Sequence, residues 1–133
     1  ENEAKTLLRQ LYETLELPGT LSDYHFALQQ THDDLRNYIG QEPWVLSEIE
    51  KLCLLNIQLF DKHPETITYE TDEGTHFFGV TAFRSLLNLY ENEGYLREAL
   101  EVAKIAVRFN YGNELVEELE ERIKLLESED VYV

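Results

Sequence analysis

The sequence predicts an all-α fold, an antiparallel array of about six helices. Three observations lead to this prediction. Apolar residues recur every three or four positions along most of the 133 residues, which is the spacing of an amphipathic helix. Gly and Pro residues divide this pattern into segments of helical length. Hydrophobic residues make up 43% of the sequence, enough for a folded core, so we expect one helical domain over residues 1–133.

Residues 1–64 are expected to hold the first three helices. A leucine-rich stripe predicts a helix over residues 3–16, which Pro18 ends. Ser22 is the predicted N-cap of the second helix, and Gly40 stands where that helix should stop. Each of these helices has one apolar face and one polar face, as expected of helices at the surface of a bundle.

The third helix is predicted to start at Pro43 and to end near His63. Apolar residues fall around most of its circumference, so we expect it to be the central and most buried helix. Its cysteine, Cys53, lies between leucines and is predicted to be a buried structural thiol, because a nucleophilic thiol needs an accessible, electropositive setting.

Residues 65–79 interrupt the helical pattern. Residues 67–71 alternate and are rich in β-forming side chains, and a turn at residues 72–74 follows them. A short β-hairpin fits this segment, and so does an irregular loop held by Phe77 and Phe78. The segment is long for a connection between helices, and long connections are often functional.

Three more helices are expected after this segment. Helical spacing marks residues 83–90, 96–106 and 115–126, and Asn113 is the predicted cap of the last helix. Glutamates occupy the outer faces of that helix, so residues 114–130 are expected to act as a capping helix with an acidic outer surface.

Seven positions in the second half follow the spacing of one helix–turn–helix repeat: Phe83, Leu86, Tyr90, Gly94, Leu96, Ala99 and Ala106. With these residues, the segment 80–113 resembles one tetratricopeptide repeat. Leu87 and Tyr111 depart from the pattern. The resemblance implies a right-handed superhelical array, and the alternative is a generic helical hairpin. Because one repeat cannot bury its own apolar faces, the neighbouring helices must cover it.

The resemblance also implies a partner-binding groove on the inner face of the first repeat helix. Arg84 and Asn88 fall on groove-facing positions, and we add Glu91 on the same face and Tyr69 from the long connection as candidate partner-binding residues. The pair Arg84 and Asn88 resembles part of a carboxylate clamp for acidic peptides. The alternative is an arginine in a surface salt bridge.

The charge of the chain limits its partners. The 27 Asp and Glu residues outnumber 11 Lys and Arg residues, which gives a net charge of −16. This charge argues against direct binding to nucleic acid or to an anionic membrane, and it favours a basic protein or peptide as partner. No apolar run approaches the roughly 20 residues of a membrane helix. We expect a cytoplasmic protein, and the sequence leaves its oligomeric state open.

No catalytic pattern stands out in the sequence. There is no Gly-rich phosphate loop and no nucleophile elbow, and one cysteine excludes a multi-cysteine metal site. His25 and His32 are seven residues apart, which is not the usual spacing of helical metal ligands, so both are predicted to be solvated surface residues. We therefore expect neither a cofactor nor a metal, and no enzymatic activity.

These observations together favour a protein–protein interaction module with a scaffold or regulatory role. The sequence contains no methionine, even at position 1, so we expect it to belong to a longer or processed chain. Two alternatives remain. One is an acidic mimic of nucleic acid that inhibits a DNA-binding protein, and the other is a helical enzyme whose site is not recognised.

Overall fold

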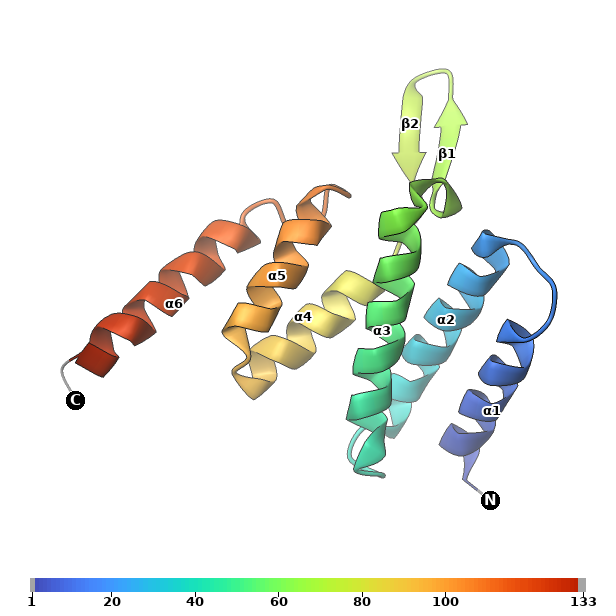
Figure 1. The fold of residues 1–133 in the computed structure, drawn as a ribbon, viewed down its shortest axis with the longest axis horizontal. Coiled ribbons are helices and arrows are strands. Elements are labelled where there is room, and N and C mark those ends of the chain that lie inside the picture. The colour runs from blue at the N-terminus through green and yellow to red at the C-terminus, as the bar shows by residue number, and fades with distance from the viewer. Residues whose placement is uncertain (1, 132–133) are drawn as a thin grey trace. The chain divides into compact units, whose positions relative to one another are not determined.

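A computed structural model of the chain describes residues 2–131, with side chains as far as Ser128. Helices account for 72% of it, and six α-helices accompany one small two-stranded sheet (Figure 1). The predicted all-α class is therefore confirmed. The chain divides into two compact units, residues 1–82 and residues 83–133, which are described in turn. None of the described helices is long and apolar enough to cross a membrane.

The first unit begins with two capped helices, α1 (Glu3–Leu15) and α2 (Leu21–Leu35). The Asn2 side chain accepts hydrogen bonds from the first turn of α1. Thr20, and not the predicted Ser22, caps α2, because Thr20 is extended and forms a reciprocal capping box with Asp23. The Ser22 hydroxyl instead donates to the carbonyl oxygen of Thr66 at 3.2 Å.

The third helix of this unit is α3 (Trp44–Lys62), which begins directly after Pro43 as predicted. Within the unit, α2 packs against both α1 and α3. Seven residues of α3 are buried, as expected of the most buried helix, whereas Leu55 on another face is exposed. Cys53 is completely buried, as predicted.

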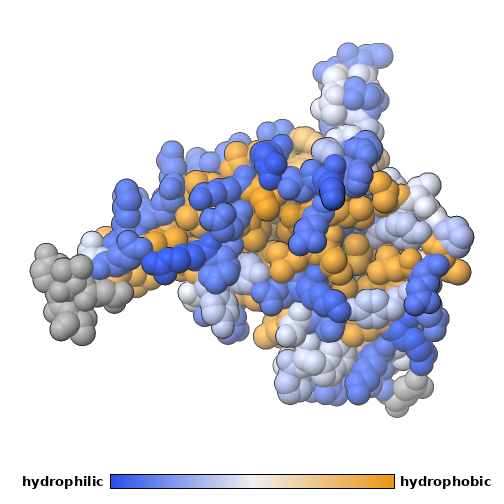
Figure 2. All heavy atoms as spheres, in the orientation of Figure 1, coloured by the Kyte–Doolittle hydropathy of each residue, from blue (hydrophilic) through white to orange (hydrophobic). Residues whose placement is uncertain are grey.

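The hairpin alternative for the long connection is confirmed. Strands β1 (Thr68–Thr71) and β2 (Gly74–Phe77) pair antiparallel around a two-residue turn. The register places Tyr69 opposite His76. The hairpin extends beyond the C-terminal end of α3 in Figure 1, and Figure 2 shows its tip as hydrophilic. Its base is held in the core of the unit by Ile67, which is completely buried.

The second unit consists of α4 (Ala82–Glu93), α5 (Leu96–Val107) and α6 (Leu115–Val131). Gly94 separates α4 from α5 with a φ of +80°, a conformation that glycine adopts without a steric cost. The residues that carry the repeat resemblance form much of the buried core of this unit: Phe83, Leu86, Tyr90, Leu96, Ala99 and Ala106.

Two features of this unit fall outside the repeat pattern. Leu87 is buried although the pattern has a small residue there, and Tyr111 stacks against the ring of Phe83 at a centroid distance of 5.8 Å. Tyr111 lies in the turn that follows the C-terminal end of α5. Helix α6 starts two residues after Asn113, the cap that the sequence predicted.

Candidate functional site

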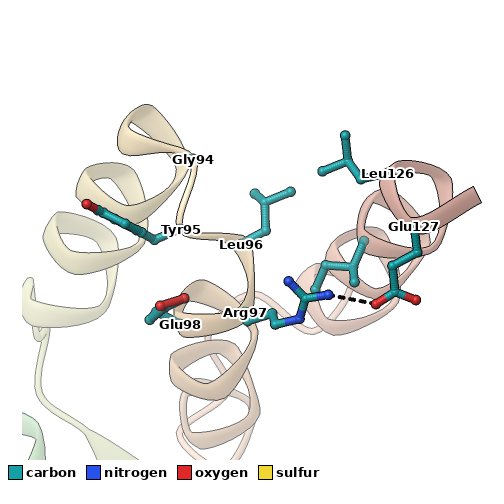
Figure 3. Close-up of a pocket in the computed structure, with 8 residues that line it drawn as sticks. Gly94, Tyr95, Leu96, Arg97, Glu98, Leu126 and Glu127 are labelled. Carbon is teal, nitrogen blue, oxygen red and sulfur yellow. Dashed lines mark hydrogen bonds and ion pairs between the residues drawn. The ribbon is translucent and has the colours of Figure 1, made fainter. Parts of the chain in front are cut away.

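A groove in the second unit is a candidate binding site. The first turn of α5 and the C-terminal half of α6 enclose a cavity of about 370 Å³ (Figure 3). We call it the α5–α6 groove. Its main lining residues are Tyr95, Leu96, Arg97, Ile123, Leu126 and Glu127.

The length of α6 explains why the groove exists. Helix α6 has 17 residues and α5 has 12, so α6 is longer by about 7 Å at 1.5 Å per residue. Its apolar stripe starts under α5 at Leu119, which is completely buried, and continues through the half-buried Ile123. At the next turn Leu126 is 51% exposed. The stripe therefore continues past the helix that covers it.

The floor of the groove is apolar. Leu96 from α5 and Leu126 from α6 point toward the same space in Figure 3. Leu96 is nearly covered, whereas Leu126 and the neighbouring Tyr95, which is 53% exposed, present apolar surface to solvent. An apolar side chain of a partner that entered here would displace water from both leucines.

Two ion pairs border this apolar floor. Arg97 Nη2 lies 2.7 Å from Glu127 Oε1, and Arg122 Nη1 lies 3.2 Å from Glu91 Oε1. At 100° per residue, Arg122 and Glu127 fall on opposite sides of the stripe that contains Leu126. Exposed pairs of this kind add only about 0–1 kcal/mol to stability. Their main effect is to link α6 to α4 on one side and to α5 on the other.

Three of the four predicted partner-binding residues lie on α4. Arg84 and Asn88 are exposed, and Glu91 follows on the same helical face, at positions i, i+4 and i+7. Glu91 pairs with Arg122 of α6, but neither of these two residues lines the α5–α6 groove. Tyr69 is also exposed, but it lies on β1 in the other unit, so the four residues do not share one unit.

The residue that sequence reasoning missed is Leu126. A leucine in a helical stripe predicts core, and we had assigned it to the buried face of the last helix. The sequence held no signal for its exposure, because helical periodicity does not show where the neighbouring helix ends. Leu125, at 63% exposure, lies beside Leu126 but does not line the groove.

The first unit corrects our prediction for the histidines. His25 and His32 are both completely buried, not solvated. His25 Nδ1–H donates to Asn56 Oδ1 at 2.6 Å, and Asn56 Nδ2 donates to His32 Nε2 at 3.2 Å. The two histidines, two turns apart on α2, thus face α3. The prediction failed because their partner, Asn56, lies on a different helix.

The buried histidines are neutral at physiological pH. Burial lowers the pKa of His25 below its usual value, and it lowers the pKa of His32 to about 4. The Asp33 carboxylate, 3.3 Å from His32 Nδ1, opposes this shift only in part. With Nε2 accepting from Asn56, the proton of neutral His32 is on Nδ1, toward Asp33. The network is polar and buried, and both of its histidines are uncharged at physiological pH.

The cysteine and the potential metal ligands are the other groups that could react or coordinate. Burial raises the pKa of the Cys53 thiol to about 12, so the thiol stays protonated and is a poor nucleophile. Among the described residues, no three His, Cys, Asp or Glu side chains are placed to hold one metal ion.

No protein-family model, no curated protein and no solved structure matches this chain. The resemblance of residues 80–113 to a tetratricopeptide repeat therefore stays a prediction that rests on the residues named above. The function must be argued from the groove itself.

Proposed function

We propose that this protein is a protein-interaction module and that the α5–α6 groove receives an apolar side chain of its partner. One observation carries this proposal: Leu126 is half-exposed at the end of an apolar stripe whose Leu119 is buried and whose Ile123 is half-buried, with an ion pair on each side of the stripe. Interfaces concentrate their binding energy in such apolar pockets, and polar groups around the pocket exclude water. The repeat resemblance also implies a peptide-binding role.

The partner should be basic. The arginines beside the groove are already paired with glutamates, whereas further acidic side chains of α6 are exposed: Glu117, Glu118, Glu120 and Glu121. Together with the net charge of −16, these carboxylates attract Lys and Arg side chains. We propose an amphipathic helix with a basic flank, since such a helix places its apolar anchors between two helices and its charges at the edge.

The exposed residues Arg84 and Asn88 extend the same proposal along α4. Asn88 lies about one turn and Arg84 about two turns before Glu91, the residue that pairs with α6. A partner helix longer than the groove would contact them through polar groups. We propose a cytoplasmic location, because one buried cysteine suits a reducing compartment.

Site-specific crosslinking tests the proposal. A photo-crosslinking amino acid is placed at position 126 in one sample and at position 125 in another, and both proteins are irradiated in the cells that produce the chain. We expect a discrete basic protein to be captured from position 126 and much less of it from position 125. Equal capture from the two positions would show that the groove does not direct the contact.

A further inference from the structure

A row of aromatic rings joins α2 to the hairpin in the first unit. The ring of Phe26 lies 6.1 Å from that of Phe78, which lies 4.9 Å from that of Tyr69. Tyr69 in turn stacks on His76 across the strand pair, at 5.2 Å and an interplanar angle of 24°. We call these four side chains the aromatic row. Residues about 50 positions apart in the sequence thus present one continuous aromatic surface.

The aromatic row is exposed to solvent. Phe26 is 46% exposed, Tyr69 43% and Phe78 41%. Isolated apolar residues at a surface are common and need no explanation. Three large rings joined through Phe78, each exposed by more than two fifths, form a patch of the kind that marks an interaction site.

Anchoring the hairpin does not account for this exposure. The base of the hairpin is already fixed by Ile67, which is buried and whose carbonyl oxygen accepts from Phe78 N at 2.6 Å. After the hairpin, the Thr81 hydroxyl donates to Asp33 Oδ1 at 2.7 Å, and Thr81 N donates to Gln29 Oε1 at 3.1 Å. The chain is held on both sides of the aromatic row, so the exposed ring faces are available to a partner.

The segment of the chain that carries Tyr69, His76 and Phe78 is acidic. Between Lys62 and Arg84 the sequence contains no Lys or Arg. The same interval contains four acidic residues, all of them exposed: Glu65, Glu70, Asp72 and Glu73. Glu65 lies 3.3 Å from His63 Nδ1, and no ion pair to Glu70, Asp72 or Glu73 is among the contacts of the described residues. Aromatic rings on a hairpin with an acidic turn match a cationic group that also has a flat surface to stack.

We propose that the aromatic row binds an arginine-bearing segment of a partner protein. A guanidinium group stacks on the face of Tyr69 or Phe78 and is attracted by the turn carboxylates of Asp72 and Glu73. Arginine fits better than lysine, because its planar head stacks on a ring and sheds water more readily than an ammonium group. This surface belongs to the first unit and is independent of the α5–α6 groove.

The test uses two labelled peptides of equal length and charge, one alternating Arg with Gly and the other alternating Lys with Gly. Their affinities are measured by fluorescence anisotropy at physiological ionic strength. We expect the Arg peptide to bind more tightly. The double variant Tyr69→Leu/Phe78→Leu should weaken binding of the Arg peptide by about three- to tenfold. Each exposed cation–π contact contributes less than one factor of ten to the affinity.

Matched variants separate this site from general attraction to an acidic protein. Tyr12→Leu removes a ring of similar exposure, 37%, from α1, outside the aromatic row and the α5–α6 groove, and should leave the affinity unchanged. Asp72→Asn/Glu73→Gln should weaken binding more than the charge-matched Glu120→Gln/Glu121→Gln on α6. Circular dichroism checks that each variant is folded.

Three results would overturn the proposal: equal affinity for the Arg and Lys peptides, an effect of Tyr12→Leu as large as that of the double variant, or equal effects of the two charge variants. The groove variant Leu126→Glu should bind the Arg peptide like the parent protein. A failure of the aromatic row and a failure of the α5–α6 groove are therefore distinguishable.

Discussion

The amide nitrogen of Asn56 lies 3.2 Å from Nε2 of His32, in a part of the first unit where both side chains are completely buried. The same amide accepts from His25 through its oxygen. One side chain of α3 therefore partners one ring nitrogen of each of the two histidines of α2. Because buried polar groups without partners are costly, this arrangement favours one register of α2 against α3.

Replacing Asn56 should destabilise the protein. Asn56→Ala leaves a buried nitrogen on each histidine without its partner and opens a small cavity, so we expect the free energy of unfolding to fall by about 2–4 kcal/mol. Urea denaturation measures this change. Gln58→Ala, at an exposed site of the same helix, is the control and should change stability little. Similar losses in both variants would contradict the role of the network.

The network also predicts a dependence of stability on pH. The pKa of His32 is about 4 in the folded protein and about 6.5 when unfolded. Above pH 6.5 the side chain is neutral in both states, and its contribution to stability is complete. As the pH falls from about 6.5 to 4, the unfolded state takes up the proton first. Stability is then lost, by at most about 1.4 kcal/mol per pH unit for this histidine.

Many carboxylates titrate near the same range, so the histidine contribution is measured as a difference. The unfolding free energies of the parent and of His32→Gln are compared between pH 7 and pH 4. We expect the parent to lose more stability than the variant as the pH falls. Equal losses of unfolding free energy in the parent and the variant would show that His32 has the same pKa in the folded and unfolded states.

The thiol of Cys53 should be protected in the folded protein. It is completely buried, and burial raises its pKa to about 12, so both access and thiolate formation are suppressed. Mass spectrometry after iodoacetamide treatment should find the native protein unmodified and the urea-unfolded protein fully alkylated. Rapid alkylation under native conditions would contradict the burial of this side of α3.

A larger side chain in the core of the second unit should lower the free energy of unfolding. Ala99 on α5 is completely buried, and a larger side chain there must displace its neighbours. Ala99→Leu should lower the free energy of unfolding by about 1–3 kcal/mol. Glu101→Leu adds a leucine at an exposed position of the same helix and serves as the control. A melting curve that is unchanged by Ala99→Leu would show that α5 does not pack tightly through this face.

The helices were predictable because their signal is local. Apolar spacing and Gly or Pro residues locate all six to within a few residues, and Gly94 ends α4 where the sequence indicated. The burial of His25 and His32 was not predictable in this way. It depends on Asn56, 24 and 31 residues away in the sequence, and on which face of α2 meets α3.

The candidate site was predictable only in part. Glu91 was predicted as a partner-binding residue; it pairs with Arg122 of α6, and its role in binding stays a prediction. The apolar centre, Leu126, was read as core, because the sequence shows the periodicity of a helix and not the place where its neighbour ends. Exposure at that point depends on the difference in length between α5 and α6.

The proposed binding of a partner in the α5–α6 groove is tested most directly by a pair of adjacent substitutions. Leu126→Glu places a charge in the groove, whereas Leu125→Glu places the same charge on the next residue, which is at least as exposed and does not line the groove. The affinity of the crosslinked partner is measured for both variants by calorimetry. We expect Leu126→Glu to weaken binding by about tenfold or more and Leu125→Glu to have little effect. Equal affinities for the two variants would contradict the proposed interface.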